Sequence, residues 1–116
     1  MKGNFCTELG KIYYSEEVIA NIVGLSTMEC YGVVGMASKN ATDGLWELMK
    51  GGNLSKGVKV ASKEEGLFIE LFIIVEYGTK ISVIANNIIQ KVKYTVGSFT
   101  GLAVEGITVN VKGVRV

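Results

Sequence analysis

The stretch from Leu67 to Tyr77 (LFIELFIIVEY) constrains the fold most, because a long apolar run with two spaced glutamates is typical of a central β-strand. Its odd positions are all apolar, whereas its even positions hold two phenylalanines, one isoleucine and two glutamates. Side chains alternate between the two faces of a strand, so the odd positions predict a buried face and the even positions a partly covered face. The apolar residues of the even face, Phe68, Phe72 and Ile74, are therefore a candidate interaction surface.

Two segments with apolar residues at helical spacing are predicted to be the helices that cover the sheet. The first helix follows Ser15, an expected N-cap, carries Glu16 and Glu17 in its first turn and extends to about Cys30. The predicted buried face of this helix consists of Val18, Ile19, Ile22, Val23 and Leu25. The second helix follows the central strand, and its predicted buried face consists of Ile81, Ile84, Ala85, Ile88, Val92, Thr95, Val96 and Phe99.

Shorter apolar runs predict the remaining strands, at residues 10–14, 33–37 and 58–62 and from Gly101 onward, and a short helix is expected at residues 45–50. The turn between the 58–62 strand and the central strand is short and polar, which predicts an antiparallel hairpin. The order β-α-β-β-β-α-β predicts an α+β fold. This fold is a two-layer sandwich in which two main helices pack on one face of a mostly antiparallel sheet.

The last strand contains a change of phase. Its apolar residues occupy even positions up to Val104 and odd positions from Ile107, across Glu105 and Gly106. A β-bulge at this point reconciles the two phases, because one extra residue moves the following side chains to the opposite face. Beyond the bulge, the residues predicted to face water are Thr108, Asn110 and Lys112.

The chain is expected to be one domain, with residues 1–9 as an N-terminal tail and residues 10–116 as the folded part. The N-terminal sequence lacks an apolar segment of signal-peptide length. The longest wholly apolar run, Leu71 to Val75, is far shorter than the about 18 residues needed to span a bilayer. The sequence therefore predicts a cytoplasmic protein without direct membrane insertion.

The residue chemistry excludes several kinds of catalytic and metal site. The sequence contains no histidine, so it has neither an imidazole base nor a histidine-ligated metal. We interpret Cys6 and Cys30 as reduced thiols, and the alternative, a redox pair, requires that the two lie close together. Glu70 and Glu76 share a strand face, but six residues of extended chain separate them by about 20 Å, too far for an acid/base pair. We therefore expect a protein that is not an enzyme and has no cofactor.

An alternative function comes from the segment around Gly51 and Gly52. Lys50, Lys56 and Lys59 lie around these glycines and could hold an anion together with backbone amides, although their spacing differs from the phosphate-binding pattern GxxxxGK[ST]. The alternative is a small nucleic-acid or anionic-ligand binding module. The chain as a whole has 12 basic and 11 acidic residues, and this near-neutral balance argues against nucleic acid as a partner.

Several groups of residues occur in a specific order and spacing along nearly the whole chain. They are Gly10-x-Ile12-x-x-Ser15-x-x-Val18-Ile19-Ala20, Gly32-Val33-Val34-Gly35-Met36, Asn53-Leu54-Ser55-Lys56-Gly57-Val58-Lys59-Val60, Val75-Glu76-Tyr77-Gly78, Thr100-Gly101-Leu102 and Val109-x-Val111-x-Gly113-Val114. Together they resemble the alkaline shock protein family of Gram-positive bacteria, also called envelope stress response or general stress proteins. The chain is short and lacks long charged tails, which makes it most similar to the compact housekeeping-type members.

The resemblance implies a function but no active site, because this family has no known catalytic residues. Its members are described as cytosolic proteins that self-associate, and some are held at the membrane by a separate anchor protein. We therefore expect a non-enzymatic scaffold or adaptor of the cell-envelope or general stress response type. Its expected partners are further copies of itself, as a homo-oligomer, and a membrane-anchor protein that holds it at the inner face of the membrane.

Overall fold

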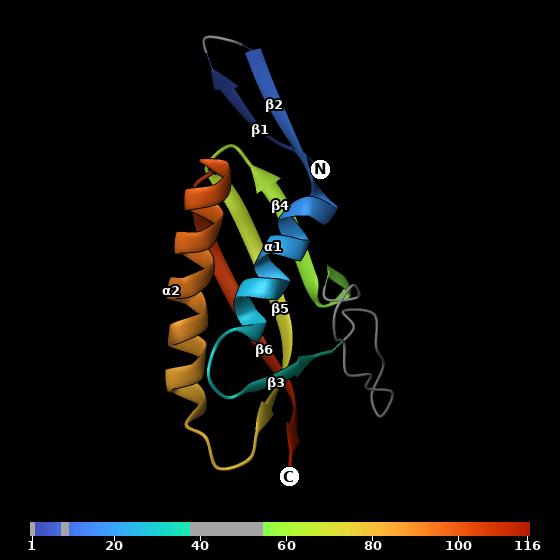
Figure 1. Cartoon of the computed structure of the whole chain (residues 1–116), viewed down its shortest axis with the longest axis vertical. Helices are drawn as coiled ribbons and strands as arrows, with labels where there is room; N and C mark the ends of the chain where they lie inside the picture. Colours follow the sequence, from blue (N-terminus) through green and yellow to red (C-terminus); the bar gives the residue numbers. More distant parts are fainter. Residues whose placement is uncertain (1, 8–9, 38–54) are drawn as a thin grey trace.

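The computed structural model describes residues 2–7, 10–37 and 55–116, and it has the α+β architecture that the sequence predicts (Figure 1). Two helices lie together on one face of a sheet, and a separate two-stranded hairpin projects from one end of this body. The elements in chain order are β1 (Lys2–Thr7), β2 (Gly10–Ser15), α1 (Glu16–Met28), β3 (Val33–Met36), β4 (Val58–Lys63), β5 (Gly66–Glu76), α2 (Ile81–Thr100) and β6 (Val104–Arg115). The short helix predicted at residues 45–50 lies outside the described residues.

Strand β5 organises the main sheet because it is paired along both edges. One edge pairs in parallel with β6, over Leu67 to Glu76. The other edge pairs antiparallel with β4 over Gly66 to Leu71 and then with β3 over Ile73 to Val75, which confirms the predicted hairpin of β4 and β5. β3 and β4 therefore follow one another along the same edge of β5. Adjacent parallel strands need a crossover connection, and α2 provides it between β5 and β6.

The odd-numbered residues of β5 form the centre of the core, as their period predicts. Each of them is at most 2% exposed: Leu67, Ile69, Leu71, Ile73 and Val75. Helix α1 contacts β3 and β4 above them, and α2 contacts β6. Tyr77, which was expected to continue this buried face, is 71% exposed because it lies beyond Glu76, the last residue of β5.

Helix α1 begins as predicted but buries a different set of side chains. The Oγ of Ser15 accepts a hydrogen bond from the N–H of Val18 at 3.1 Å and caps the helix. The prediction that Val18 and Leu25 are buried is wrong, since both are exposed, whereas Ser26 and Thr27 are buried. The hydroxyls of Ser26 and Thr27 donate to the carbonyl oxygens four residues earlier, both at 2.8 Å, so their burial leaves the hydroxyls satisfied. The face of α1 that packs on the sheet is therefore rotated toward these small residues.

Helix α2 packs on the sheet through a stripe with a spacing of four residues, which largely follows the prediction. The buried residues of this stripe are Ile84, Ile88, Val92, Val96 and Thr100. Ile81 and Phe99 were expected on the same face, but both are exposed. They lie in the first and the last turn of the helix, where a side chain has packing neighbours on one side only.

Strand β6 contains the predicted bulge and a second one. Leu67 pairs with Val104 and Phe68 pairs with Gly106, so Glu105 is the extra residue where the change of phase placed it. A second shift, in which Lys112 is the extra residue, occurs near the end of the strand and was not predicted. Both bulges bend the strand while the segment between them stays in regular register with β5.

The hairpin of β1 and β2 forms a two-stranded antiparallel sheet of its own. From the sequence, residues 2–7 are expected in a polar tail, but they form β1 and pair with residues 10–15. The sequence of β1 (KGNFCT) lacks the apolar alternation of a half-buried strand, and its strand conformation depends on pairing with β2.

We predict that Leu71→Ala lowers the free energy of unfolding by about 2–5 kcal/mol, because it removes a fully buried side chain at the centre of β5 and leaves a cavity. Urea denaturation followed by far-UV circular dichroism measures this change. Thr108→Ala is the control, since the exposed Thr108 side chain should contribute less than about 0.5 kcal/mol. Equal effects of the two substitutions would contradict the assignment of the two faces.

Candidate functional site

The side of the sheet opposite the two helices is the candidate site. We call it the open face and define it by the even-numbered residues of β5, Phe68 to Glu76, together with their register partners on β4 and β6. Both helices lie on the other side of the sheet (Figure 1). Among the described residues, neither a helix nor a further strand layer covers the open face. The structure thus brings the three predicted surface residues, Phe68, Phe72 and Ile74, onto one face of one strand.

Phe68 lies across β6 at the first bulge. Its register partner is Gly106, and a Cβ atom on Gly106 would lie only 2.9 Å from Cδ1 of Phe68, so the ring rests over the glycine. The Nζ of Lys63, at the end of β4, is 4.8 Å from the centroid of the ring. This is the geometry of a cation–π contact, in which the lysine stem covers part of the ring while its ammonium group stays in water. Phe68 is therefore half-buried by its own neighbours.

Phe72 and Ile74 differ in how much surface they offer. Phe72 is half-buried, and the Nζ of Lys112 lies 5.9 Å from the centroid of its ring. Ile74 is only 8% exposed, and its register partner is Gly113. The exposed apolar part of the candidate surface consequently consists of the two phenylalanine rings, each partly covered by a lysine.

Between the two rings, Glu70 is held by a side chain of β6. The Nδ2 of Asn110 donates to Oε2 of Glu70 at 3.1 Å and to the carbonyl oxygen of Leu71 at 3.1 Å. The prediction that Asn110 faces water is therefore only partly right, because this amide is half-buried and links two strands. The contact orients the Glu70 carboxylate, whereas Thr108 is exposed as predicted.

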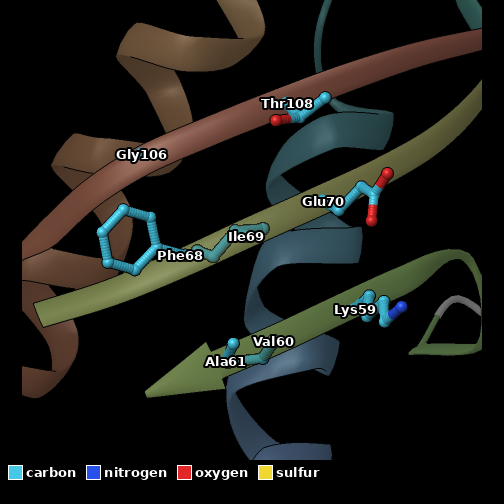
Figure 2. A pocket seen from close by; sticks show the side chains of 8 residues that line it. All are labelled: Lys59, Val60, Ala61, Phe68, Ile69, Glu70, Gly106 and Thr108. Carbon is cyan, nitrogen blue, oxygen red and sulfur yellow. The ribbon is translucent and has the colours of Figure 1, made fainter. Parts of the chain in front are cut away.

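A hollow of about 310 Å³ lies on the open face between β4, β5 and β6. Its lining, shown in Figure 2, consists of Lys59, Val60, Ala61, Phe68, Ile69, Glu70, Gly106 and Thr108. The ring of Phe68 forms an apolar end, and Lys59, Glu70 and Thr108 bring an ammonium group, a carboxylate and a hydroxyl to the rest of the wall. A hollow of this kind suits one side chain of a docked protein, with the apolar part against the ring.

The lysines of the alternative anion-binding loop are only partly described. Lys50 lies outside the described residues, whereas Lys56 and Lys59 are both exposed. Lys59 is the register partner of Glu70, so it belongs to the wall of the hollow. The anion-binding loop stays a prediction.

Cys30 lies at the end of α1, away from the open face. Its Sγ donates to the carbonyl oxygen of Ser26 at 3.5 Å, and burial raises the pKa of this thiol while the ammonium group of Lys91 lowers it to a smaller extent. Lys91 also forms an ion pair with Glu29, with 3.2 Å between Nζ and Oε1. The side chain of Cys6 is not described, so the redox pair of the two cysteines stays untested.

Residues 4–116 match the model of the family of alkaline shock protein 23, which is described as having a cell envelope-related function. The chain belongs to this family. The resemblance found in the sequence is thereby confirmed over nearly the whole chain.

Three relatives match this chain along most of their own length. The uncharacterized protein YloU of Bacillus subtilis is 50% identical over 111 residues, which cover 95% of this chain and 92% of YloU. The uncharacterized protein Spy1614 of Streptococcus pyogenes is 40% identical over the same shares of both chains, and YqhY of Bacillus subtilis is 31% identical over 94% of this chain and 80% of YqhY. No solved structure matches the chain. In the part of the chain that is described, no helix is long and apolar enough to cross a membrane.

Asn110→Ala should lower the free energy of unfolding by about 1–2 kcal/mol, because it removes two hydrogen bonds between β6 and β5 at a half-buried position. Asn110→Asp is the matched variant, since it keeps the size of the side chain but replaces the donor with a second carboxylate beside Glu70. Both substitutions should destabilise the fold in urea denaturation at pH 7. Unchanged stability of both variants would show that the amide does not link the strands.

The raised pKa of Cys30 predicts slow alkylation. In a Cys6→Ser background, iodoacetamide should modify Cys30 more slowly than it modifies glutathione at pH 8, because less of the buried thiol is ionised at that pH. Lys91→Ala should slow the reaction further, since it removes the charge that lowers the pKa. Mass spectrometry of timed samples measures the rates, and a Cys30 that reacts faster than glutathione would contradict the role of burial.

Proposed function

We propose that this member of the alkaline shock protein family is a non-enzymatic scaffold or adaptor of the cell envelope. It acts through self-association and through a protein partner that docks on the open face. A membrane-anchor protein as that partner would hold the otherwise cytoplasmic chain at the inner face of the membrane. The observation that carries the proposal is a sheet face that no helix or strand of the described residues covers, with two half-buried aromatic rings, Phe68 and Phe72.

The chemistry of the open face suits protein docking. Aromatic side chains are enriched at the centre of protein interfaces, where they supply a large contact area with little loss of conformational freedom. Both rings are already positioned, because Phe68 rests over Gly106 and each ring has a lysine ammonium group within 6 Å of its centroid. A partner can therefore displace the two lysine side chains from the rings without any change in the backbone.

The family description supports the same conclusion from another direction. The family has a cell envelope-related function, and the three relatives come from Bacillus and Streptococcus, which are Gram-positive bacteria. A protein partner at the envelope would place the chain where the family description puts its function. The open face is the surface that we assign to this contact.

A photo-crosslinking experiment tests the assignment. A photoreactive phenylalanine analogue replaces Phe72 in the full chain, in cells that normally make the protein, and the crosslinked proteins are identified by mass spectrometry. The control carries the analogue at Tyr94, which is 75% exposed on α2 and outside the open face. We expect one or a few defined cell-envelope proteins linked to position 72 and not to position 94.

A substitution then separates docking from folding. In a chain with the analogue at Phe68, Phe72→Asp should abolish the adduct with that partner, because it places a charge where an apolar ring is needed. The thermal unfolding midpoint should change by only a few degrees, since Phe72 lies outside the core of the fold. Adducts that are equal at positions 72 and 94, or that persist with Phe72→Asp, would contradict the proposed docking surface.

A further inference from the structure

Strand β6 has one edge that lacks a partner in the described structure. Its inner edge pairs with β5 from Val104 to Arg115, and within residues 2–7, 10–37 and 55–116 no strand pairs with its outer edge. An unpaired edge presents a row of backbone N–H and C=O groups that can bind a further strand. At 12 residues, β6 is also the longest strand of the described chain.

The apolar side chains of β6 show that the core is incomplete along this edge. Val104, Ile107, Val109 and Val111 pack against the core but stay half-exposed, whereas the core residues of the neighbouring β5 are at most 2% exposed. A further strand beside β6 would cover these side chains as well as the backbone groups. The edge therefore offers both hydrogen bonds and apolar area to a strand that is added there.

The sequence of β6 is complementary to a second copy of itself in antiparallel orientation. The two bulges, at Glu105 and Lys112, leave Gly106 to Val111 as the regular segment. If two such segments pair antiparallel about Val109, Ile107 of one copy lies opposite Val111 of the other. Both residues face the helices, so this register pairs core-facing side chains with core-facing side chains, as one continuous sheet requires.

The charges of β6 favour the same orientation. Glu105 lies at the beginning of the strand, and Lys112 and Arg115 lie at its end. Antiparallel pairing about Val109 places Glu105 of one copy opposite Gly113 of the other, one position from Lys112, and this occurs twice in each dimer, whereas parallel pairing would place like charges together. This complementarity identifies a second copy of the chain as the strand that binds the edge.

We propose that two copies of the protein associate through β6, antiparallel and about a twofold axis at Val109, so that their sheets form one continuous sheet. The inference rests on the self-association in the proposed function and names its interface. All four main helices then lie on one side of the joined sheet, and the two open faces lie next to each other on the other side. The dimer presents two docking surfaces side by side, which raises the avidity for a partner with two binding segments.

A disulfide test reports the interface directly. In the full chain with Cys6→Ser and Cys30→Ser, Val109→Cys places two thiols on the twofold axis, where directly opposite Cα atoms of paired strands are about 4.5–5.5 Å apart and can form a disulfide. Val60→Cys is the matched control, because Val60 is a half-buried valine of β4 that packs against the same core. Under mild oxidation, the Val109→Cys protein should become a disulfide-linked dimer at least about tenfold faster than the control.

Charge reversal gives a second readout that does not disturb the core. Glu105→Lys changes an exposed residue of the bulge and should weaken the dimer by about three- to tenfold in sedimentation equilibrium, because it replaces two opposite-charge contacts with like-charge contacts. Adding Lys112→Glu should restore the dissociation constant of the unmodified protein. A double variant that is no tighter than Glu105→Lys alone would overturn the antiparallel register.

The outcomes separate this inference from the proposed function. A wild-type dimer in sedimentation, with Val109→Cys no faster to crosslink than Val60→Cys, would overturn the β6 interface and leave self-association standing. A wild-type protein that remains a monomer at 100 µM would overturn the interface and self-association together. Neither result would alter the adducts expected at Phe72, which test docking on the open face.

Discussion

The structure depends on the two different faces of β5. One face carries five side chains that are almost completely buried under the two helices, and their removal from water is the main stabilising contribution to the fold. The other face carries Phe68, Glu70 and Phe72, and neither helix reaches it. Because α2 is the crossover between two adjacent parallel strands, it must lie on one side of the sheet, and α1 packs beside it. The open face is therefore a consequence of the topology.

The sequence predicted those features that depend on one element alone. The period of β5 predicted both of its faces, the change of phase in β6 predicted the bulge at Glu105, and Ser15 was predicted as the N-cap of α1. The side chains that were assigned to the wrong face are those whose burial depends on contacts between elements. Leu25 is exposed and Thr27 buried because the orientation of α1 follows its packing on the sheet, and a hydroxyl bonded within the helix can be buried at little cost.

In the candidate site, too, the contacts between elements could not be predicted from the sequence. Phe68 and Phe72 could be found from the alternation of one strand, but Gly106 and Asn110, which lie against this face, come from β6, about 40 residues later in the chain. The ring of Phe68 lies over Gly106, and Asn110 contacts Glu70. Both contacts follow from the register of β5 with β6, which the periodicity of the sequence does not encode. The glycine and the amide therefore have no signal in the sequence apart from their place near a predicted bulge.

Carbene footprinting at neighbouring residues of β5 tests the central claim most directly, namely that one face of this strand is core and the other is a docking surface. In the purified protein, we expect Phe72 to be labelled and Leu71 to be protected, since Phe72 is half-buried on the open face and Leu71 is fully buried on the core face. In intact cells, labelling of Phe72 should fall while that of the exposed Tyr94 stays the same. Labelling of Phe72 that is equal in the purified protein and in cells would contradict the account.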